Sequence, residues 1–126
     1  MILFYAANND RVVHTLEAQT AQFRVVRCRS FETMLKRLRT PRHGLEVALV
    51  VVSEKDEMER LSGLRNLLRD LRLVVVLPRR DDETVAWAHK MGPRFIAYAD
   101  NGYDQVGAVI VKMMRSSRHQ PAASGV

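Results

Sequence analysis

The chain has 126 residues, a length typical of one domain that buries its own core. It carries a formal net charge of +6 and a sequence pI of about 10.1, so a nucleic acid enters as one candidate partner. One cysteine excludes an intrachain disulfide, and no apolar run reaches the roughly 20 residues that span a bilayer. No basic segment precedes the first apolar run, so we expect a cytoplasmic protein without membrane attachment.

The first quarter of the chain predicts a strand, a helix and a second strand. The apolar run Met1–Ala7 is too short for a helix and predicts a strand buried on both faces. The polar residues 8–10 can cap a helix over about 10–22. Partial alternation of polar and apolar residues over Phe23–Cys28 then predicts a strand at or near a sheet edge.

The middle of the chain repeats this order. A helix opens near Ser30 and ends at Thr40, because the following proline disfavours helix in the residue before it. Leu45–Val52 is the most apolar run and predicts the central strand of a parallel sheet. A helix is expected from about Asp56 to Asp70, with leucines at helical spacing.

The last third predicts two more strand–helix units. Leu73–Leu77 is the fourth strand, and an aspartate at 81–82 caps the next helix. That helix ends at Gly92–Pro93, where a glycine favours a helix end and a proline prevents its continuation. Phe95–Ala99 is the fifth strand, and a final helix covers about 103–114.

Strands that alternate with helices imply parallel pairing and right-handed crossovers. We therefore expect an α/β fold, a five-stranded parallel sheet with helices on both faces. One domain should cover residues 1–115. The small and polar residues 116–126 are expected to form a disordered tail.

Three local segments carry a resemblance to a known family. They are Ile2-Leu3-Phe4-Tyr5 at the first strand, Phe23–Val26 with Ser30–Leu35 at the second strand and helix, and Gly92–Ile96 at the entry to the fifth strand. Together with the five strand–helix units, they resemble the receiver domain of two-component response regulators, the CheY-like branch of the flavodoxin-like fold.

The residues that such receivers use for phosphorylation do not match this sequence. Typical receivers place paired acids after the first strand, a phosphoacceptor aspartate at the end of the third, a hydroxyl residue after the fourth and a lysine in the fifth. The matching positions here are Ala6, Ala7, Val51, Val52, Ser53, Pro78 and Ala99. Mg²⁺ needs oxygen ligands that these side chains do not supply. The resemblance thus implies a degenerate receiver, or pseudo-receiver, without metal, cofactor or catalysis.

A receiver-like chain without this pocket is expected to signal through protein–protein contact, with a partner or as a homodimer. The surface formed by the fourth helix, fifth strand and last helix is the candidate interaction face. Its proposed residues, expected to be exposed and apolar, are Trp87, Tyr98, Val111 and Met114.

Two other functions stay open. The acid-free basic run that ends the second helix, Lys36, Arg37, Arg39 and Arg42, could contact nucleic-acid phosphates. A small-ligand or enzyme module would instead need a polar pocket at the carboxyl edge of the sheet, near Asn8, Asn9, Ser53 and Arg79.

Other chemical motifs favour structural roles. The acids Glu54, Asp56, Glu57 and Glu59 could form a displaced cation site, but acids are common in the first turn of a helix. Ser53 is more typical of a helix cap than of a nucleophile. The four histidines show no metal-ligand spacing with each other or with Cys28.

Overall fold

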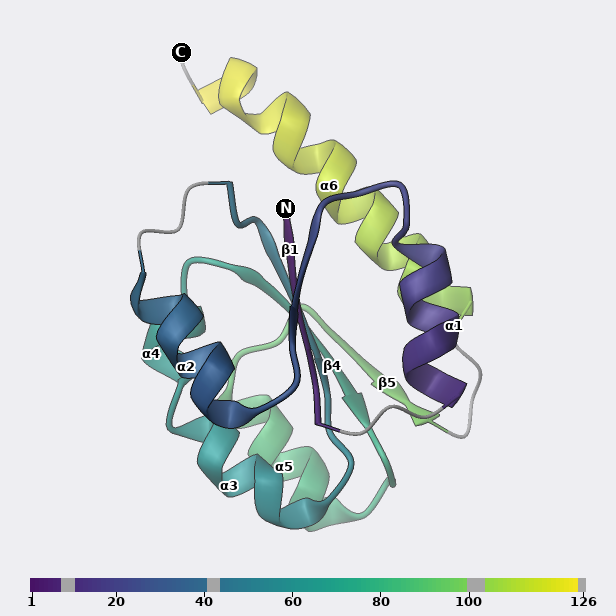
Figure 1. Cartoon of the computed structure of the whole chain (residues 1–126), viewed down its shortest axis with the longest axis vertical. Coiled ribbons are helices and arrows are strands. Elements are labelled where there is room, and N and C mark those ends of the chain that lie inside the picture. The colour runs from purple at the N-terminus through teal and green to yellow at the C-terminus, as the bar shows by residue number, and fades with distance from the viewer. Residues whose placement is uncertain (8–10, 41–43, 100–103, 125–126) are drawn as a thin grey trace.

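The structure is a computed structural model that describes residues 1–7, 11–40, 44–99 and 104–124. Five parallel strands form one sheet in the order β2-β1-β3-β4-β5 (Figure 1). They are β1 (Ile2–Ala6), β2 (Val25–Cys28), β3 (Val47–Val51), β4 (Arg72–Leu77) and β5 (Phe95–Tyr98). The fold class predicted from the sequence is confirmed.

Helices cover both faces of the sheet (Figure 1). One face carries α1 (Arg11–Gln19) and α6 (Asp104–Ser124). The other carries α2 (Phe31–Arg39), α3 (Lys55–Ser62), α4 (Arg65–Leu68) and α5 (Asp82–Lys90). Each layer buries its own apolar cluster against the sheet, and burial of this surface is the main force that holds the layers together.

Strand β3 occupies the centre of the sheet, as its sequence predicts. All five of its residues are buried, because helices cover both of its faces and strands flank both of its edges. Strand β2 lies at one edge, which agrees with its mixed pattern of half-buried residues. Cys28, at the end of β2, is buried in the core, and burial raises the pKa of its thiol.

The helix expected over 56–70 is two helices. Gly63 ends α3, and Leu64 has φ −93° and ψ 2°, outside the helical region. The break lets Leu64 and Leu68 both reach the core below α2 and α3. The apolar spacing in the sequence is continuous across the break, so periodicity alone predicts one helix.

The predicted helix starts are confirmed at two places. The Ser30 hydroxyl accepts a 3.1 Å hydrogen bond from the Thr33 backbone N–H and caps α2. The Asp81 carboxylate caps α5 by accepting from the Thr84 backbone N–H at 2.8 Å. Gly92 has φ +69°, the left-handed conformation that glycine adopts most readily after a helix.

Helix α6 is longer than the sequence predicts. It continues to Ser124, through most of the 116–126 segment that composition assigns to a disordered tail. The polar residues 115–120 continue the helix, and Pro121 lies in its last turn. Among the described residues, none of the helices has the length and apolar content needed to cross a membrane.

Candidate functional site

The carboxyl edge of the sheet brings together the positions where a receiver would hold its acids. Ala6 pairs with Val51, and Val51 pairs with Val76, so these positions on the three strands lie at one level. Ala6 is fully buried, and Val51 and Val52 are 4% and 3% exposed. Of the other predicted pocket residues, Ala7 is exposed and Ser53, Pro78 and Ala99 are half-buried. Asn8, Asn9 and Asp10 lie outside the described residues.

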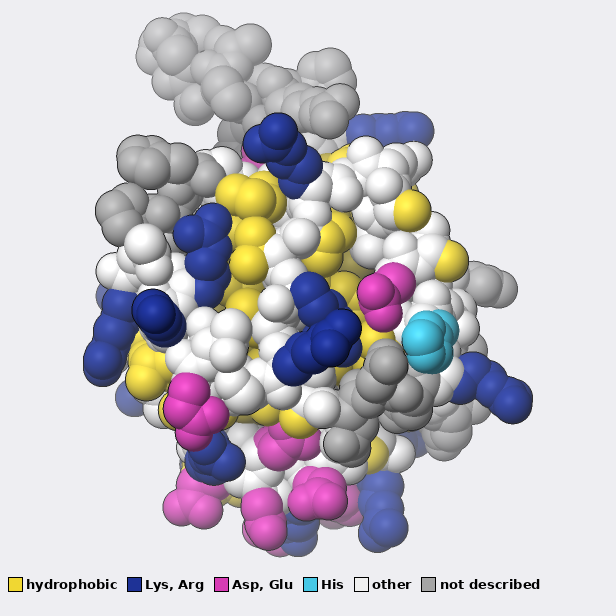
Figure 2. All heavy atoms as spheres, viewed as in Figure 1, with side chains coloured by type: hydrophobic (Ala, Val, Ile, Leu, Met, Phe, Trp, Pro, Cys, Tyr) yellow, Lys and Arg dark blue, Asp and Glu magenta, His cyan; other side chains and the backbone are white. Residues whose placement is uncertain are grey.

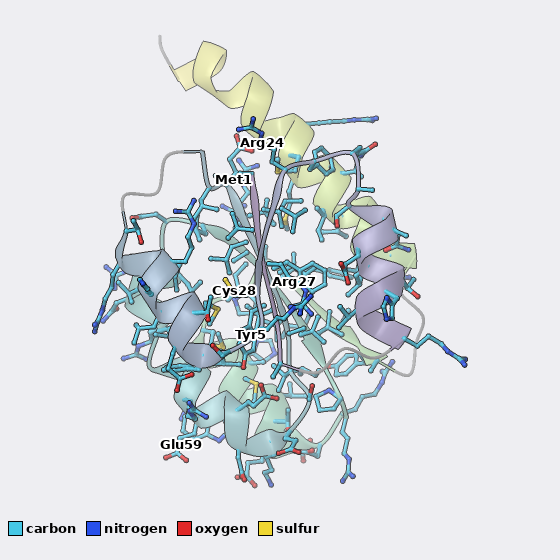
Figure 3. All side chains as sticks on the ribbon, in the orientation of Figure 1. Met1, Tyr5, Arg24, Arg27, Cys28 and Glu59 are labelled. Atoms are coloured by element: carbon cyan, nitrogen blue, oxygen red, sulfur yellow. The ribbon has the colours of Figure 1, made fainter. Side chains whose placement is uncertain are left out.

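A cation from the edge strand lies against the end of β1. The Arg27 guanidinium donates hydrogen bonds to the carbonyl oxygens of Ala6 at 3.0 Å and Cys28 at 2.9 Å. It also lies 5.0 Å from the centroid of the Phe4 ring, on the face of the sheet that carries α1 (Figure 3). The carboxyl end of β1 therefore faces a fixed positive charge from β2.

On the opposite face, Tyr5 connects the first strand to α3. Its hydroxyl donates a 2.7 Å hydrogen bond to Oε2 of Glu57. Oε1 of the same carboxylate accepts from the backbone N–H groups of Ser53 at 2.8 Å and Glu54 at 3.0 Å. Burial first, and the bond to Glu57 second, raise the pKa of Tyr5 above its usual range. The hydroxyl therefore keeps its proton beyond the pH at which an exposed tyrosine loses it.

This contact is not predicted by the sequence, whose patterns place Glu57 in a general acidic first turn and Tyr5 in a strand core. Glu57 stands three residues after the cap position Glu54, which is the spacing of a capping box. This pattern predicts the hydrogen bond from the Glu54 backbone to the Glu57 carboxylate. Nothing in the sequence indicates that the Tyr5 hydroxyl also donates to the Glu57 carboxylate, because Tyr5 and Glu57 are 52 positions apart.

The remaining acids after β3 point to solvent. Glu54, Asp56 and Glu59 are exposed. No group of three or more potential ligands capable of holding a metal ion occurs within the described residues. Asp56 and Glu57 lie in the first turn of α3, and Glu54 is its N-cap.

Two hollows flank the start of α3. The first, about 340 Å³, lies between the ends of β1 and β2 and is lined by Tyr5, Ala7, Arg29, Ser30, Phe31, Glu32, Glu54, Glu57 and Arg60. The second, about 320 Å³, lies between the loops after β3 and β4 and is lined by Ser53, Glu54, Lys55, Pro78, Arg79, Asp81 and Thr84. The second thus brings together Ser53 and Arg79, two of the residues near which the sequence places a possible small-ligand pocket.

The basic run lies on α2, near its C-terminal end. Lys36 and Arg39 are exposed and Arg37 is half-buried, whereas Arg42 lies outside the described residues. Figure 2 shows Lys and Arg side chains at several places on the face viewed, while Asp and Glu side chains gather at its lower end, around α3 and α5. Lys and Arg side chains also lie among these acids (Figure 2). Lys55 pairs with Glu83 at 2.6 Å, and Arg60 pairs with Glu32 at 3.5 Å.

The predicted interaction face needs one correction. Met114 is 3% exposed and packs in the core with Ile110 and Val106, so it is not a surface residue. Met114 lies four residues after Ile110 and therefore on the same side of α6. The sequence does not reveal this side clearly, because apolar residues occur almost all round the helix. Val111 is half-buried and lies outside that stripe.

The aromatic residues of this face are half-buried and each contacts a cation. The Lys90 ammonium lies 4.5 Å from the Trp87 ring centroid, and the Arg80 guanidinium lies 4.3 Å from the Tyr98 ring centroid. Both rings also pack against the core below α5. Water is thus kept from part of each ring by an amphipathic side chain rather than by the core alone.

No family model and no curated protein matches this sequence. Solved structures share the fold. A CheY-like response regulator receiver domain protein from Methanospirillum hungatei matches with a TM-score of 0.71 at 12% identity, covering 94% of this chain and 96% of that one. A response regulator from Thermotoga maritima matches with a TM-score of 0.70 at 14% identity, covering 91% and 98%.

Two structures from Burkholderia pseudomallei are also similar. A putative pilus assembly-related protein gives a TM-score of 0.66 at 15% identity, covering 89% of this chain and 87% of that one. A response regulator with a phosphorylated aspartic acid and a calcium ion gives 0.67 at 16% identity, covering 98% and 71%. The chain therefore has the fold of CheY-like receiver domains, at an identity too low to carry function with it.

Proposed function

We propose that this chain is a cytoplasmic receiver-like signalling module that acts through protein–protein contact, independently of aspartyl phosphorylation. The observation that carries the proposal is at the end of β1. A fully buried alanine, Ala6, occupies the position where a receiver would have an acid. Its carbonyl oxygen accepts a hydrogen bond from the Arg27 guanidinium. A receiver that is phosphorylated would need acids and a metal ion at this place.

The chemistry of phosphorylation supports this proposal. Mg²⁺ prefers carboxylate, phosphate and water oxygens, and its charge offsets the negative charge of the transferred phosphoryl group. Val51 and Val52 supply neither a ligand nor a nucleophile, and they are buried in apolar surroundings. The nearby Arg27 charge would further repel a divalent cation. One of the similar structures carries a phosphorylated aspartic acid, which has no counterpart at residues 51–53 here.

The surface of α5, β5 and α6 is the proposed contact face, now without Met114. It offers Trp87, Tyr98 and Val111 as half-buried apolar groups. Aromatic residues are enriched in the cores of protein interfaces because they bury a large area with few rotatable bonds. A second copy of this chain or a different protein would displace Lys90 and Arg80 from the rings.

A direct test is to incubate the protein with Mg²⁺ and acetyl phosphate and to measure its intact mass. We expect no gain of a phosphoryl group, whereas a response regulator that retains its acids gains one under the same conditions. A stoichiometric gain that hydroxylamine removes would identify an acyl phosphate and refute the proposal. Sedimentation of the wild type and of Trp87→Ala then shows whether the face forms a homodimer.

One observation favours a second function, the binding of a small ligand. The hollow of about 320 Å³ brings Ser53 and Arg79 to one place, and the buried Thr84 also lines it. A polar compound there would meet the Arg79 guanidinium and the Ser53 hydroxyl, and also the carboxylates of Glu54 and Asp81. A thermal-shift screen of nucleotides and sugar phosphates tests this function, and a shift that Arg79→Ala abolishes would support it.

A further inference from the structure

Acids and cations are divided unevenly between the two edges of the sheet. The segments 53–60 and 78–83, which leave β3 and β4 at the carboxyl edge, hold more acids than cations. Their acids are Glu54, Asp56, Glu57, Glu59, Asp81, Asp82 and Glu83, and their cations are Lys55, Arg60, Arg79 and Arg80. These segments therefore contribute nothing to the net charge of +6 that the whole chain carries.

The opposite, amino edge of the sheet is a continuous row of strand starts. Backbone hydrogen bonds of 2.7–3.0 Å join each strand start to the next across the whole sheet. In spatial order, the residues joined are Arg24, Ile2 with Met1, Glu46, Arg72 and, through the carbonyl of Leu73, Arg94. Adjacent strands lie about 4.8 Å apart, so four spacings separate Arg24 from Arg94 by roughly 19 Å. Three of these five strand starts carry an arginine.

Helix α6 brings two more cations to the amino edge. The Arg72 guanidinium donates a 2.7 Å hydrogen bond to the carbonyl oxygen of Met113, which fixes this part of α6 beside the start of β4. Met114 packs in the cluster below α1 and α6, and the neighbouring Lys112 and Arg115 are exposed. Figure 1 shows α6 continuing past the end of the sheet where the N-terminus lies, and Figure 3 labels Arg24 and Met1 at this same end.

The cations of this edge outnumber its acids. We call them the amino-edge band, which consists of Arg24, Arg69, Arg72, Arg94, Lys112 and Arg115. Among the described residues, the same segments hold two acids, Asp70 and Glu46. The Glu46 carboxylate lies 3.4 Å from the amino group of Met1, so its charge is already balanced. A strong positive field thus remains over the amino edge.

The field of the helices does not account for this band. Cations are common in the last turn of a helix, where they interact with its partial negative charge, and this effect fades within one turn. Arg24 follows the end of α1 by five residues, and Arg94 follows the end of α5 by four. These two arginines are therefore placed by the strand starts, at the two opposite ends of the row.

We infer that the amino-edge band binds the phosphate backbone of double-stranded nucleic acid, whatever its base sequence. A duplex carries one negative charge per 1.7 Å of its axis, so it offers partners to cations that are spread along an edge. Five of the six cations are arginines, whose planar guanidinium pairs with two oxygens of one phosphate. A span of roughly 19 Å exceeds the 12 Å width of a major groove, so the band can contact phosphates of both strands.

This inference goes beyond the proposed function and does not depend on it. It also concerns another surface than the basic run of α2, where the sequence alone places a possible contact with phosphates. The amino-edge band draws its cations from β4, from α6 and from the segments that lead into β2, β4 and β5. Only the tertiary structure brings these separate segments together.

Fluorescence anisotropy of a labelled duplex of about 24 base pairs tests the inference. We expect a dissociation constant in the micromolar range at about 50 mM KCl, and equal affinity for a second duplex of unrelated sequence. Six cations less two acids suggest about four neutralised phosphates, so log K should fall with log salt at a slope of about −3.6. Absence of binding up to about 100 μM protein, or a slope shallower than about −1, would overturn the inference.

Two variants with the same loss of charge locate the site. Arg24→Gln with Arg94→Gln removes two charges from the band, and Arg11→Gln with Arg29→Gln removes two from the carboxyl edge. All four arginines are exposed, so both variants should melt like the wild type. The slope should lose about two for the first pair and stay unchanged for the second. Equal effects of the two pairs would show attraction by overall charge alone and would refute the site.

A further variant and two competitors complete the test. Arg115→Gln on α6 should reduce the slope by about one, because it removes one phosphate contact. Tighter binding to polyglutamate, or to vesicles that contain an anionic lipid, than to the duplex would overturn the assignment of nucleic acid. Loss of the duplex site leaves the signalling proposal intact, since phosphoryl uptake in the mass assay is what refutes that proposal.

Discussion

The hydroxyl of Tyr5 and the carboxylate of Glu57 form a 2.7 Å hydrogen bond that joins the first strand to the start of α3. Glu57 meanwhile accepts from two backbone N–H groups of the loop before α3, so its charge is held by three donors. Such a carboxylate fixes the position of the β3–α3 loop relative to β1. The contact lies at the edge of the sheet where receiver domains hold their phosphorylation site.

Removing the hydroxyl should weaken the fold measurably. We expect Tyr5→Phe to lower the free energy of unfolding by about 1.5–3 kcal/mol, the usual contribution of a hydrogen bond to a charged group. Urea denaturation monitored by circular dichroism measures this change. Tyr98→Phe removes a hydroxyl from a half-buried tyrosine that has no hydrogen bond to a carboxylate of the described residues, and it should change stability by less than about 0.5 kcal/mol. Equal effects of the two would contradict the role of the Glu57 contact.

The raised pKa of Tyr5 makes stability depend on alkaline pH. An unfolded tyrosine loses its proton near pH 10, whereas the folded Tyr5 keeps it, so above about pH 10 the folded state binds more protons. The contribution of this group is therefore complete below pH 10 and is lost as the pH rises further. Thermal melts from pH 8 to pH 11 should show a steeper alkaline decline for the wild type than for Tyr5→Phe. Parallel curves would argue against a buried, protonated hydroxyl.

Gly107 allows α1 and α6 to approach closely. A Cβ added at Gly107 would lie 2.6 Å from Oε1, 2.8 Å from Cδ and 3.0 Å from Cβ of Gln19, all shorter than normal contacts. Alanine gains about 1 kcal/mol over glycine in a helix, but overpacking costs about 1–3 kcal/mol. We therefore expect Gly107→Ala to destabilise the wild type and to stabilise a Gln19→Ala variant. The same sign in both backgrounds, measured by urea denaturation, would show that Gln19 does not limit the space.

Replacing two apolar residues of α6 by glutamate should affect stability differently. Met114→Glu puts a carboxylate into the core and should cost more than about 3 kcal/mol, as for an unpaired buried charge. Val111→Glu lies outside the core stripe and should leave the melting temperature nearly unchanged. If Val111→Glu also weakens self-association in sedimentation, the α5–β5–α6 face gains support. Similar melting temperatures for the two variants would contradict the orientation of α6.

An acid introduced at the end of β3 should destabilise the fold. Val51→Asp puts a carboxylate at a 4% exposed position among apolar side chains, where it should cost about 3–5 kcal/mol. Val51→Ala serves as the control for lost side-chain volume. Urea denaturation of both variants separates the charge from the cavity. A stable Val51→Asp protein would mean that this edge of the sheet is open to water.

The fold follows from the order of residues along the chain. Apolar runs of strand length, separated by amphipathic helices with caps such as Ser30 and Asp81, permit few arrangements other than a parallel sheet covered on both faces. The central place of β3 follows from its lack of polar residues, and the edge place of β2 from its mixed pattern. These features depend on local periodicity and burial, which a sequence displays directly.

Which residues meet depends instead on how the elements pack. The bond between Tyr5 and Glu57, the approach of Gly107 to Gln19 and the contact of Arg27 with the Ala6 carbonyl all join separate elements, so no local pattern predicts them. The break at Gly63–Leu64 and the burial of Met114 likewise depend on the direction from which neighbouring helices pack. Periodicity reveals that a helix has an apolar side, but only packing determines how wide that side is and which residues remain outside it.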